Sequence, residues 1–98
     1  MLTFTSLLWV WKGEASAGVW YFLTVPDEQS GEIKAQAFEI PRGFRSVRVE
    51  ARIGDVVWRT SLFPLDKGGY ILPVKAEIRK RAKLSAGDEV VTRLTLLD

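Results

Sequence analysis

Apolar and polar residues alternate along much of this chain, which is the pattern of half-buried β-strands. The clearest stretch is 47–53, where the apolar residues share one face and Arg48, Glu50 and Arg52 share the other. Gly54-Asp55 follows it and suits a primed hairpin turn, so 56–63 is expected to return antiparallel. The pattern and its turn residues predict strands at 3–11, 19–25, 47–53, 56–63, 70–72 and 89–96.

The second predicted strand, 19–25, reads VWYFLTV and is apolar on both of its faces. Such a run predicts a strand that is buried on both sides. Pro26 ends it, because a proline has no N–H to donate to a sheet ladder.

The apolar start of the chain resembles a signal peptide, since Ala15-Ser16-Ala17 follows it like a cleavage site. No Lys or Arg precedes the apolar run, however, and a signal peptide normally carries one there. The run is also far too short to span a membrane. We therefore interpret 3–11 as the first strand, and we expect no membrane association.

Two helices are predicted, each directly after a strand that ends in proline. The first covers 27–38, where Pro26 suits the helix start and acidic residues follow it. The second covers 74–83, where Val74, Ile78 and Ala82 recur at the spacing of one buried helix face. Lys75, Arg79 and Lys83 recur at the same spacing and form a basic stripe beside it.

The two halves of the sequence repeat one order of elements: strand, proline, helix, glycine turn, strand. Pro26 and Pro73 occupy matching places in the two halves, as do Ile33 and Ile78. This repetition predicts one mainly β domain over 1–98, a barrel with an internal pseudo-two-fold in which each half supplies strands and one capping helix. Chance similarity between two strand–helix–strand units is the alternative.

The composition excludes several kinds of chemistry, because the chain has no cysteine and no histidine. Disulfides, zinc sites, thiol nucleophiles and imidazole bases are therefore absent. Glu50, Asp55, Asp66 and Lys75 remain as acid or base candidates, but no spacing forces two carboxylates together. We expect no enzyme activity, no cofactor and no metal, and the lack of cysteine fits a cytoplasmic protein.

Positive charge is concentrated in two segments, although the net charge is only +2. Such clustering is typical either of an anion or nucleic-acid surface or of two solvated polar faces. The candidate anion-binding or nucleic-acid-binding residues are Arg42, Arg45, Arg48, Lys75, Arg79 and Lys83.

Four tryptophans are many for 98 residues. Aromatic residues in strands usually form the core or wall of a barrel, but they also line ligand pockets. The candidate ligand-pocket residues are Trp20, Trp58, Arg59 and Thr60.

Several long stretches resemble one bacterial family, which is numbered as domain of unknown function nineteen-hundred-and-five. The most specific of them are WRTSLFP at 58–64 and GGYILPVKAEIRK at 68–80; WYFLTVP at 20–26 and GDEV at 87–90 also match. The resemblance implies a double-split β-barrel, the class of AbrB-like and MazE-like DNA-binding domains, in which two chains pair to complete the barrel. The family is also found fused to YdeI/OmpD-associated-type domains, and it has no established activity.

These observations favour a non-enzymatic binding or protein-interaction module, either monomeric or homodimeric, that docks with a protein partner or a fused domain. One alternative is a site for a small ligand or anion, lined by Trp and Arg. The other is AbrB-like binding of nucleic acid through the basic residues, for which a net charge of +2 is low.

Overall fold

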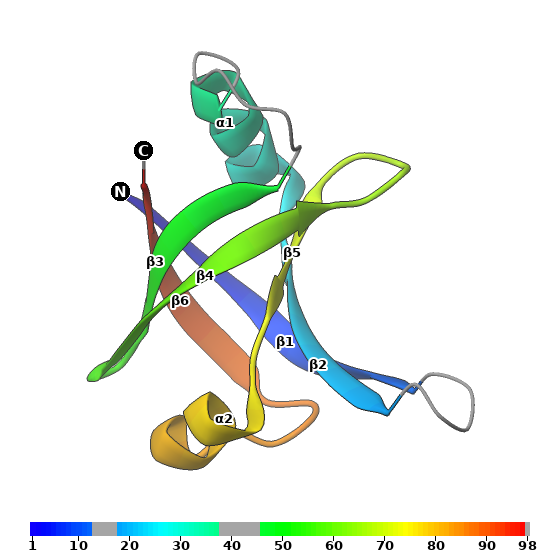
Figure 1. Ribbon diagram of the computed structural model, residues 1–98, viewed down its shortest axis with the longest axis vertical. Coiled ribbons are helices and arrows are strands. Elements are labelled where there is room, and N and C mark those ends of the chain that lie inside the picture. The colour runs from blue at the N-terminus through cyan, green and yellow to red at the C-terminus, as the bar shows by residue number, and fades with distance from the viewer. Residues whose placement is uncertain (13–17, 38–45, 98) are drawn as a thin grey trace.

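The computed structural model describes residues 1–12, 18–37 and 46–97, and within them it contains six strands and two helices. These are β1 (Leu2–Lys12), β2 (Val19–Val25), α1 (Asp27–Ala37), β3 (Val47–Ile53), β4 (Val56–Pro64), β5 (Tyr70–Pro73), α2 (Ala76–Ala82) and β6 (Glu89–Leu96). The strands pair antiparallel and close into a barrel in the order β1-β2-β5-β4-β3-β6. The two helices lie at opposite ends of this barrel (Figure 1).

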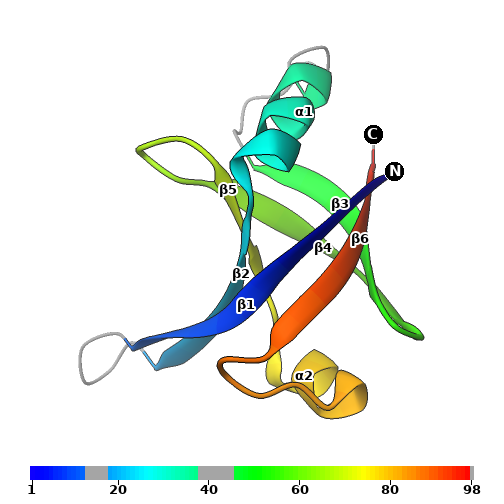
Figure 2. The same cartoon turned by 180° about the vertical axis from the view of Figure 1, so that it is seen from behind.

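The barrel closes because β1, with 11 residues, is long enough to pair with two neighbours in succession. Its first half pairs with β6 from Leu2 to Leu7, and its second half pairs with β2 from Leu8 to Lys12. Figure 2 shows β1 in front, with β6 on one side of it and β2 on the other. The change of partner falls at Leu8, whose N–H donates to the Asp88 carbonyl at 2.9 Å and whose carbonyl accepts from the Gly87 N–H at 2.7 Å.

The barrel interior is filled mainly by aliphatic side chains, with Phe4 among them, that alternate with outward-facing residues along the strands. A barrel of few strands is narrow, so its inside holds packed side chains and little else. Each helix adds an isoleucine to this core, Ile33 from α1 and Ile78 from α2. Leu8, Leu23, Leu62, Leu72 and Leu94 are among the fully buried residues.

The architecture agrees with the one predicted: mainly β, a closed barrel and two short helices. Exchanging β1 with β4, β2 with β5 and β3 with β6 returns the same closed strand order, read in the opposite direction. The same exchange swaps α1 with α2, which lie at opposite ends (Figure 1). The strand order therefore has the predicted internal pseudo-two-fold, and one chain supplies all the strands of the barrel.

The second helix starts later than predicted, at Ala76 instead of residue 74. The Val74 N–H donates to the Tyr21 carbonyl at 2.9 Å, so this residue is still tied to β2. Lys75 has an extended backbone, with φ −69° and ψ 159°. Long-range bonding to β2 thus holds the chain extended for two residues beyond Pro73, which the helical spacing alone did not reveal.

The prediction that β2 is buried on both sides is wrong. Leu23 and Val25 are buried, but Val19 and Trp20 are exposed. Both helices lie at the ends of the barrel, so neither covers the outer face of β2 (Figure 1). An apolar run therefore marks a surface here, not a second core.

A buried hydroxyl inside the barrel provides a test of the packing. Thr92 is fully buried, and its Oγ1 has no hydrogen-bond partner among the described residues. Because an unsatisfied buried hydroxyl is unfavourable, we expect Thr92→Val to raise the free energy of unfolding by about 1 kcal/mol. Urea denaturation measures this change, and Thr95→Val, on the exposed face of the same strand, is the matched control. A lower stability of Thr92→Val would contradict this account of the barrel interior.

Candidate functional site

A groove of about 540 Å³ opens on the outer surface of the barrel between β2, β4 and the segment that leads into α2. It is lined by residues 19–21 of β2, 59–61 and 63 of β4, residues 73–76 from the end of β5 to the first residue of α2, Arg79 of α2 and Arg48 of β3.

The groove exists because β5 is short. β5 pairs with β2 only from Phe22 to Val25, and with β4 only at Phe63 and Pro64. Pro73 is the last residue of β5; the Val74 N–H makes one more bond to β2, at the Tyr21 carbonyl, before the chain leaves the barrel wall for α2. The first residues of β2 and the middle of β4 therefore have no strand between them, and the gap that remains is the groove.

Four cationic side chains from four elements or junctions line this groove: Arg48, Arg59, Lys75 and Arg79. Arg48 lies opposite Ser61 in the ladder between β3 and β4, and Arg59 lies opposite Glu50. Lys75 immediately precedes α2, and Arg79 lies one turn into it. No Asp or Glu is among the described lining residues, so positive charge dominates the groove.

Arg79 is the most firmly held of these cations. Its Nη1 donates to the Val74 carbonyl at 2.7 Å. Its guanidinium carbon lies 3.6 Å from the centroid of the Tyr21 ring, which is a cation–π contact. These contacts fix the start of α2 against β2 and hold a positive charge at the wall of the groove.

Arg59 is the cation with a nearby acid. Its Nε lies 3.8 Å from Oε1 of Glu50, and both side chains are exposed to solvent. Exposed pairs of this kind contribute little, about 0–1 kcal/mol. Arg59 can therefore turn toward an anion in the groove at small cost.

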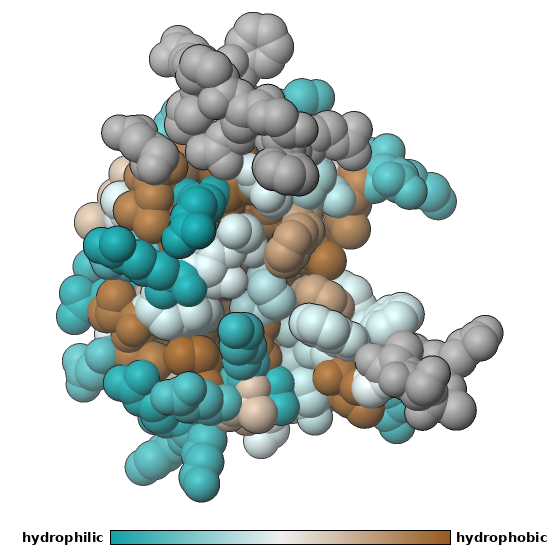
Figure 3. Space-filling view, viewed as in Figure 1, coloured by the Kyte–Doolittle hydropathy of each residue, from teal (hydrophilic) through white to brown (hydrophobic). Residues whose placement is uncertain are grey.

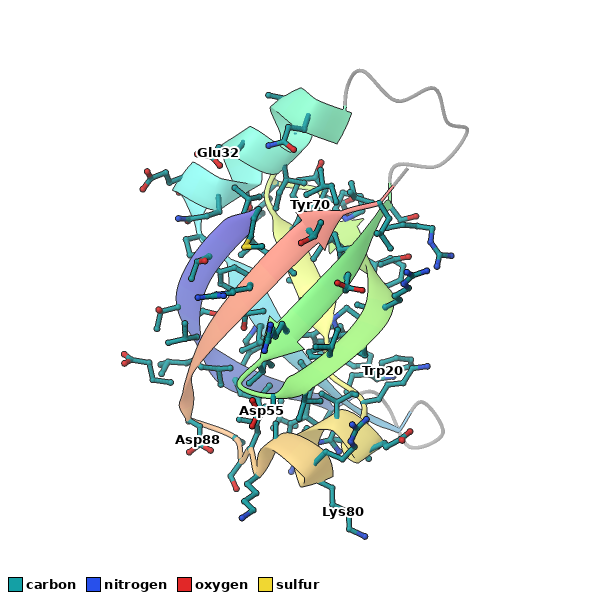
Figure 4. All side chains as sticks on the ribbon, turned by 90° about the vertical axis from the view of Figure 1, so that its left-hand side faces the viewer. Trp20, Glu32, Asp55, Tyr70, Lys80 and Asp88 are labelled. Atoms are coloured by element: carbon teal, nitrogen blue, oxygen red, sulfur yellow. The ribbon has the colours of Figure 1, made fainter. Side chains whose placement is uncertain are left out.

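Aromatic rings add a flat apolar wall. Trp20 projects from the barrel wall beside α2 (Figure 4), and it is 49% exposed. Phe63 reaches the groove from β4 and is 46% exposed. The groove therefore combines cations, which bind anions, with rings that stack on planar groups.

The structure brings together most of the described candidates from two separately predicted sets. Trp20, Arg59 and Thr60 of the predicted ligand pocket line the groove. Arg48, Lys75 and Arg79 of the predicted anion set line the same groove.

The other candidates lie elsewhere. Trp58 packs against the core, because its side chain lies on the inner face of β4, whereas the next residue, Arg59, lies on the outer face. Lys83 ends α2 in the left-handed conformation, with φ 58° and ψ 48°, and does not line the groove. Arg42 and Arg45 lie outside the described residues.

Sequence reasoning did not select Ser61 and Phe63, although the strand period carried a signal for both. They lie two and four residues after Arg59, and so share its outward face on β4. Pro73 and Tyr21 carried no comparable signal, since their place in the groove depends on which strands pair.

Within 1–12, 18–37 and 46–97, no three acidic side chains gather where they can hold a metal ion. Neither helix of the described chain is long and apolar enough to cross a membrane.

The model of a family described as Domain of unknown function (DUF1905) matches residues 4–94, and the chain belongs to this family. The match covers every strand and helix that lines the groove. No curated protein matches the chain.

The role assigned to Arg79 predicts a stability change. We expect Arg79→Met to lower the free energy of unfolding by about 1–2 kcal/mol, because it removes a charged hydrogen bond and a cation–π contact. Arg81→Met, at an exposed position of the same helix, is the matched control and should change stability by less than about 0.5 kcal/mol. Equal denaturation midpoints for the two variants would show that Arg79 does not fix α2.

Proposed function

We propose that this domain is a non-catalytic binding module whose groove binds an anionic ligand. The observation that carries the proposal is the convergence of Arg48, Arg59, Lys75 and Arg79 beside Trp20, with no acid among the described lining residues. Clefts lined by charge of one sign concentrate ligands of the opposite sign.

The residue types in the groove suit binding better than catalysis. General acid–base catalysis uses histidine or a carboxylate most often. The chain has no histidine, and the described groove residues offer cations, hydroxyls and rings. These groups hold and orient an anion without moving a proton.

The cations also favour a class of anion. The planar guanidinium groups of Arg48 and Arg59 match the oxygens of phosphate or carboxylate in pairs. Lys75 adds a compact charge, and Thr60 and Ser61 also line the groove. Trp20 and Phe63 add stacking surface, so the groove fits a ligand that joins phosphate or carboxylate to a planar ring.

Two further parts of the prediction stay proposals. The pseudo-two-fold strand order supports a likeness to AbrB-like and MazE-like barrels, with both halves supplied by one chain. The absence of cysteine supports a cytoplasmic location.

The anion site is tested by calorimetric titration with inorganic tripolyphosphate at low salt. We expect Arg48→Gln and Lys75→Gln each to weaken binding about fivefold to tenfold, because each removes one charged contact. Lys80→Gln is the matched control, since Lys80 lies on α2 but points away from the barrel (Figure 4). No measurable binding, or an equal loss for Lys80→Gln, would contradict the proposal.

Glu50 provides a test in the opposite direction. Its carboxylate lies near Arg59 and opposes an incoming anion, so we expect Glu50→Gln to strengthen tripolyphosphate binding about twofold to fivefold. Glu32→Gln removes the same charge from α1, at the far end of the barrel (Figure 4), and should leave the affinity unchanged. Weaker binding by Glu50→Gln would show that the pair with Arg59 is needed to shape the groove.

A further inference from the structure

The surface beside the groove carries a second feature, a line of aromatic side chains on the outer face of β1 and β2. We call it the aromatic row; it consists of Trp11, Trp20, Phe22 and Trp9. The strand register places Trp11 opposite Trp20 and Trp9 opposite Phe22. Along each strand these residues alternate with the buried ones, so all four lie on the outer face of the hairpin.

Three rings of the aromatic row lie close to one another, and its three tryptophans are open to solvent. The centroids of Trp20 and Phe22 are 6.3 Å apart with an interplanar angle of 9°, and those of Trp9 and Phe22 are 5.1 Å apart. Trp9, Trp11 and Trp20 are 36%, 46% and 49% exposed. Trp9 Nε1 donates to Thr24 Oγ1 at 2.8 Å, which sets the orientation of that ring. Several large apolar side chains exposed together mark a binding surface.

The aromatic row is continuous with the cationic groove. Trp20 belongs to both, and Phe22 lies opposite Pro73, which also lines the groove. β2 runs down the right-hand side of Figure 1, and the space-filling view in Figure 3 is hollowed on that side. A ligand held by the cations therefore has a row of rings directly beside it.

We propose that the ligand is a single-stranded nucleic acid, with its phosphates in the groove and its bases on the aromatic row; this rests on the anion-binding function proposed above. Single-strand binding surfaces combine a basic groove that follows the backbone with exposed rings on which successive bases stack. Both parts are present here on adjoining surfaces.

The geometry favours a single strand over a duplex and over a lone nucleotide. A base stacks on a protein ring only where its own face is not covered by a neighbouring base, as in an unstacked single strand. A duplex keeps its bases paired and stacked, and leaves the row unused. A lone nucleotide occupies Trp20 and the cations but leaves Trp9 and Trp11 exposed.

The chemistry also favours nucleic acid over a peptide. An acidic peptide satisfies Arg48, Arg59 and Lys75 but offers no planar groups to the row. A proline-rich peptide packs on aromatic rings but carries no charge for the groove. A single strand supplies both a repeated phosphate and a repeated ring.

The experiment is fluorescence anisotropy with labelled oligothymidylate and oligouridylate, each about eight nucleotides long, at about 50 mM salt. We expect both strands to bind more tightly than tripolyphosphate does in the calorimetric titration. Trp9→Leu and Trp11→Leu should each weaken strand binding about tenfold, because a stacked base is lost, and leave tripolyphosphate affinity within about twofold. Val57→Ala, an exposed apolar residue of β4 outside the groove, is the control and should change neither.

Thermal unfolding of each variant shows whether it is folded. If Trp9→Leu or Trp11→Leu does not fold, Trp9→Phe or Trp11→Phe is used in its place, and this variant should retain most of the strand affinity. Salt dependence is a second measurement: neutralising phosphates with the groove cations should make affinity fall as salt rises from about 50 to 200 mM.

Different outcomes separate the two proposals. Binding of tripolyphosphate, with strands no tighter and no effect of Trp9→Leu or Trp11→Leu, overturns the single-strand inference and leaves the anion site standing. No binding of either ligand overturns both. The inference is also overturned if the matching duplex binds more tightly than the single strand. It is likewise overturned if an oligoglutamate displaces the labelled strand as well as the unlabelled strand does. A preference for uridylate or thymidylate identifies which nucleic acid fits.

Discussion

The structure depends on the closure of a narrow barrel by one long strand. β1 pairs with β6 along its first half and with β2 along its second half, which leaves β1 no free edge between them. Closure forces every strand residue to point either into a small interior or out to the surface. Aliphatic side chains fill the interior, and the rings of Trp9, Trp11 and Trp20 lie outside. The exposed aromatic surface is thus a direct result of closing the barrel.

The candidate site lies where β5, the shortest of the described strands, ends. β5 has only four residues and ends at Pro73, so β2 and β4 separate on either side of the chain that enters α2. The cation–π contact of Arg79 with Tyr21 joins α2 to β2 at the wall of the groove. The early end of β5 therefore creates the groove, and Lys75 and Arg79 at the start of α2 supply part of its charge beside Arg48 and Arg59.

The alternation of apolar and polar residues, together with the turn residues, predicted the strands well. In a half-buried strand the buried residues are apolar and the exposed ones polar, so the two faces can be recognised in the sequence, as at 47–53. Two predictions were wrong for long-range reasons. α2 begins later than predicted because the Val74 N–H bonds to the Tyr21 carbonyl. The outer face of β2 is exposed instead of buried because neither helix covers Trp20. The meeting of Arg48, Arg59 and Lys75 was equally hidden, since it depends on the strand order around the barrel and not on any spacing along the chain.

The central claim is that the groove and the aromatic row form one binding surface on the outside of the barrel. The most direct measurement follows the four tryptophan indole N–H resonances by two-dimensional NMR during titration with unlabelled oligothymidylate. Trp58 serves as an internal reference, because it packs against the core. The account predicts that the indole resonances of Trp9, Trp11 and Trp20 shift together and saturate with one affinity, while the resonance of Trp58 does not shift. Movement of Trp58 alone, or no movement of the three outer resonances at saturation, would contradict it.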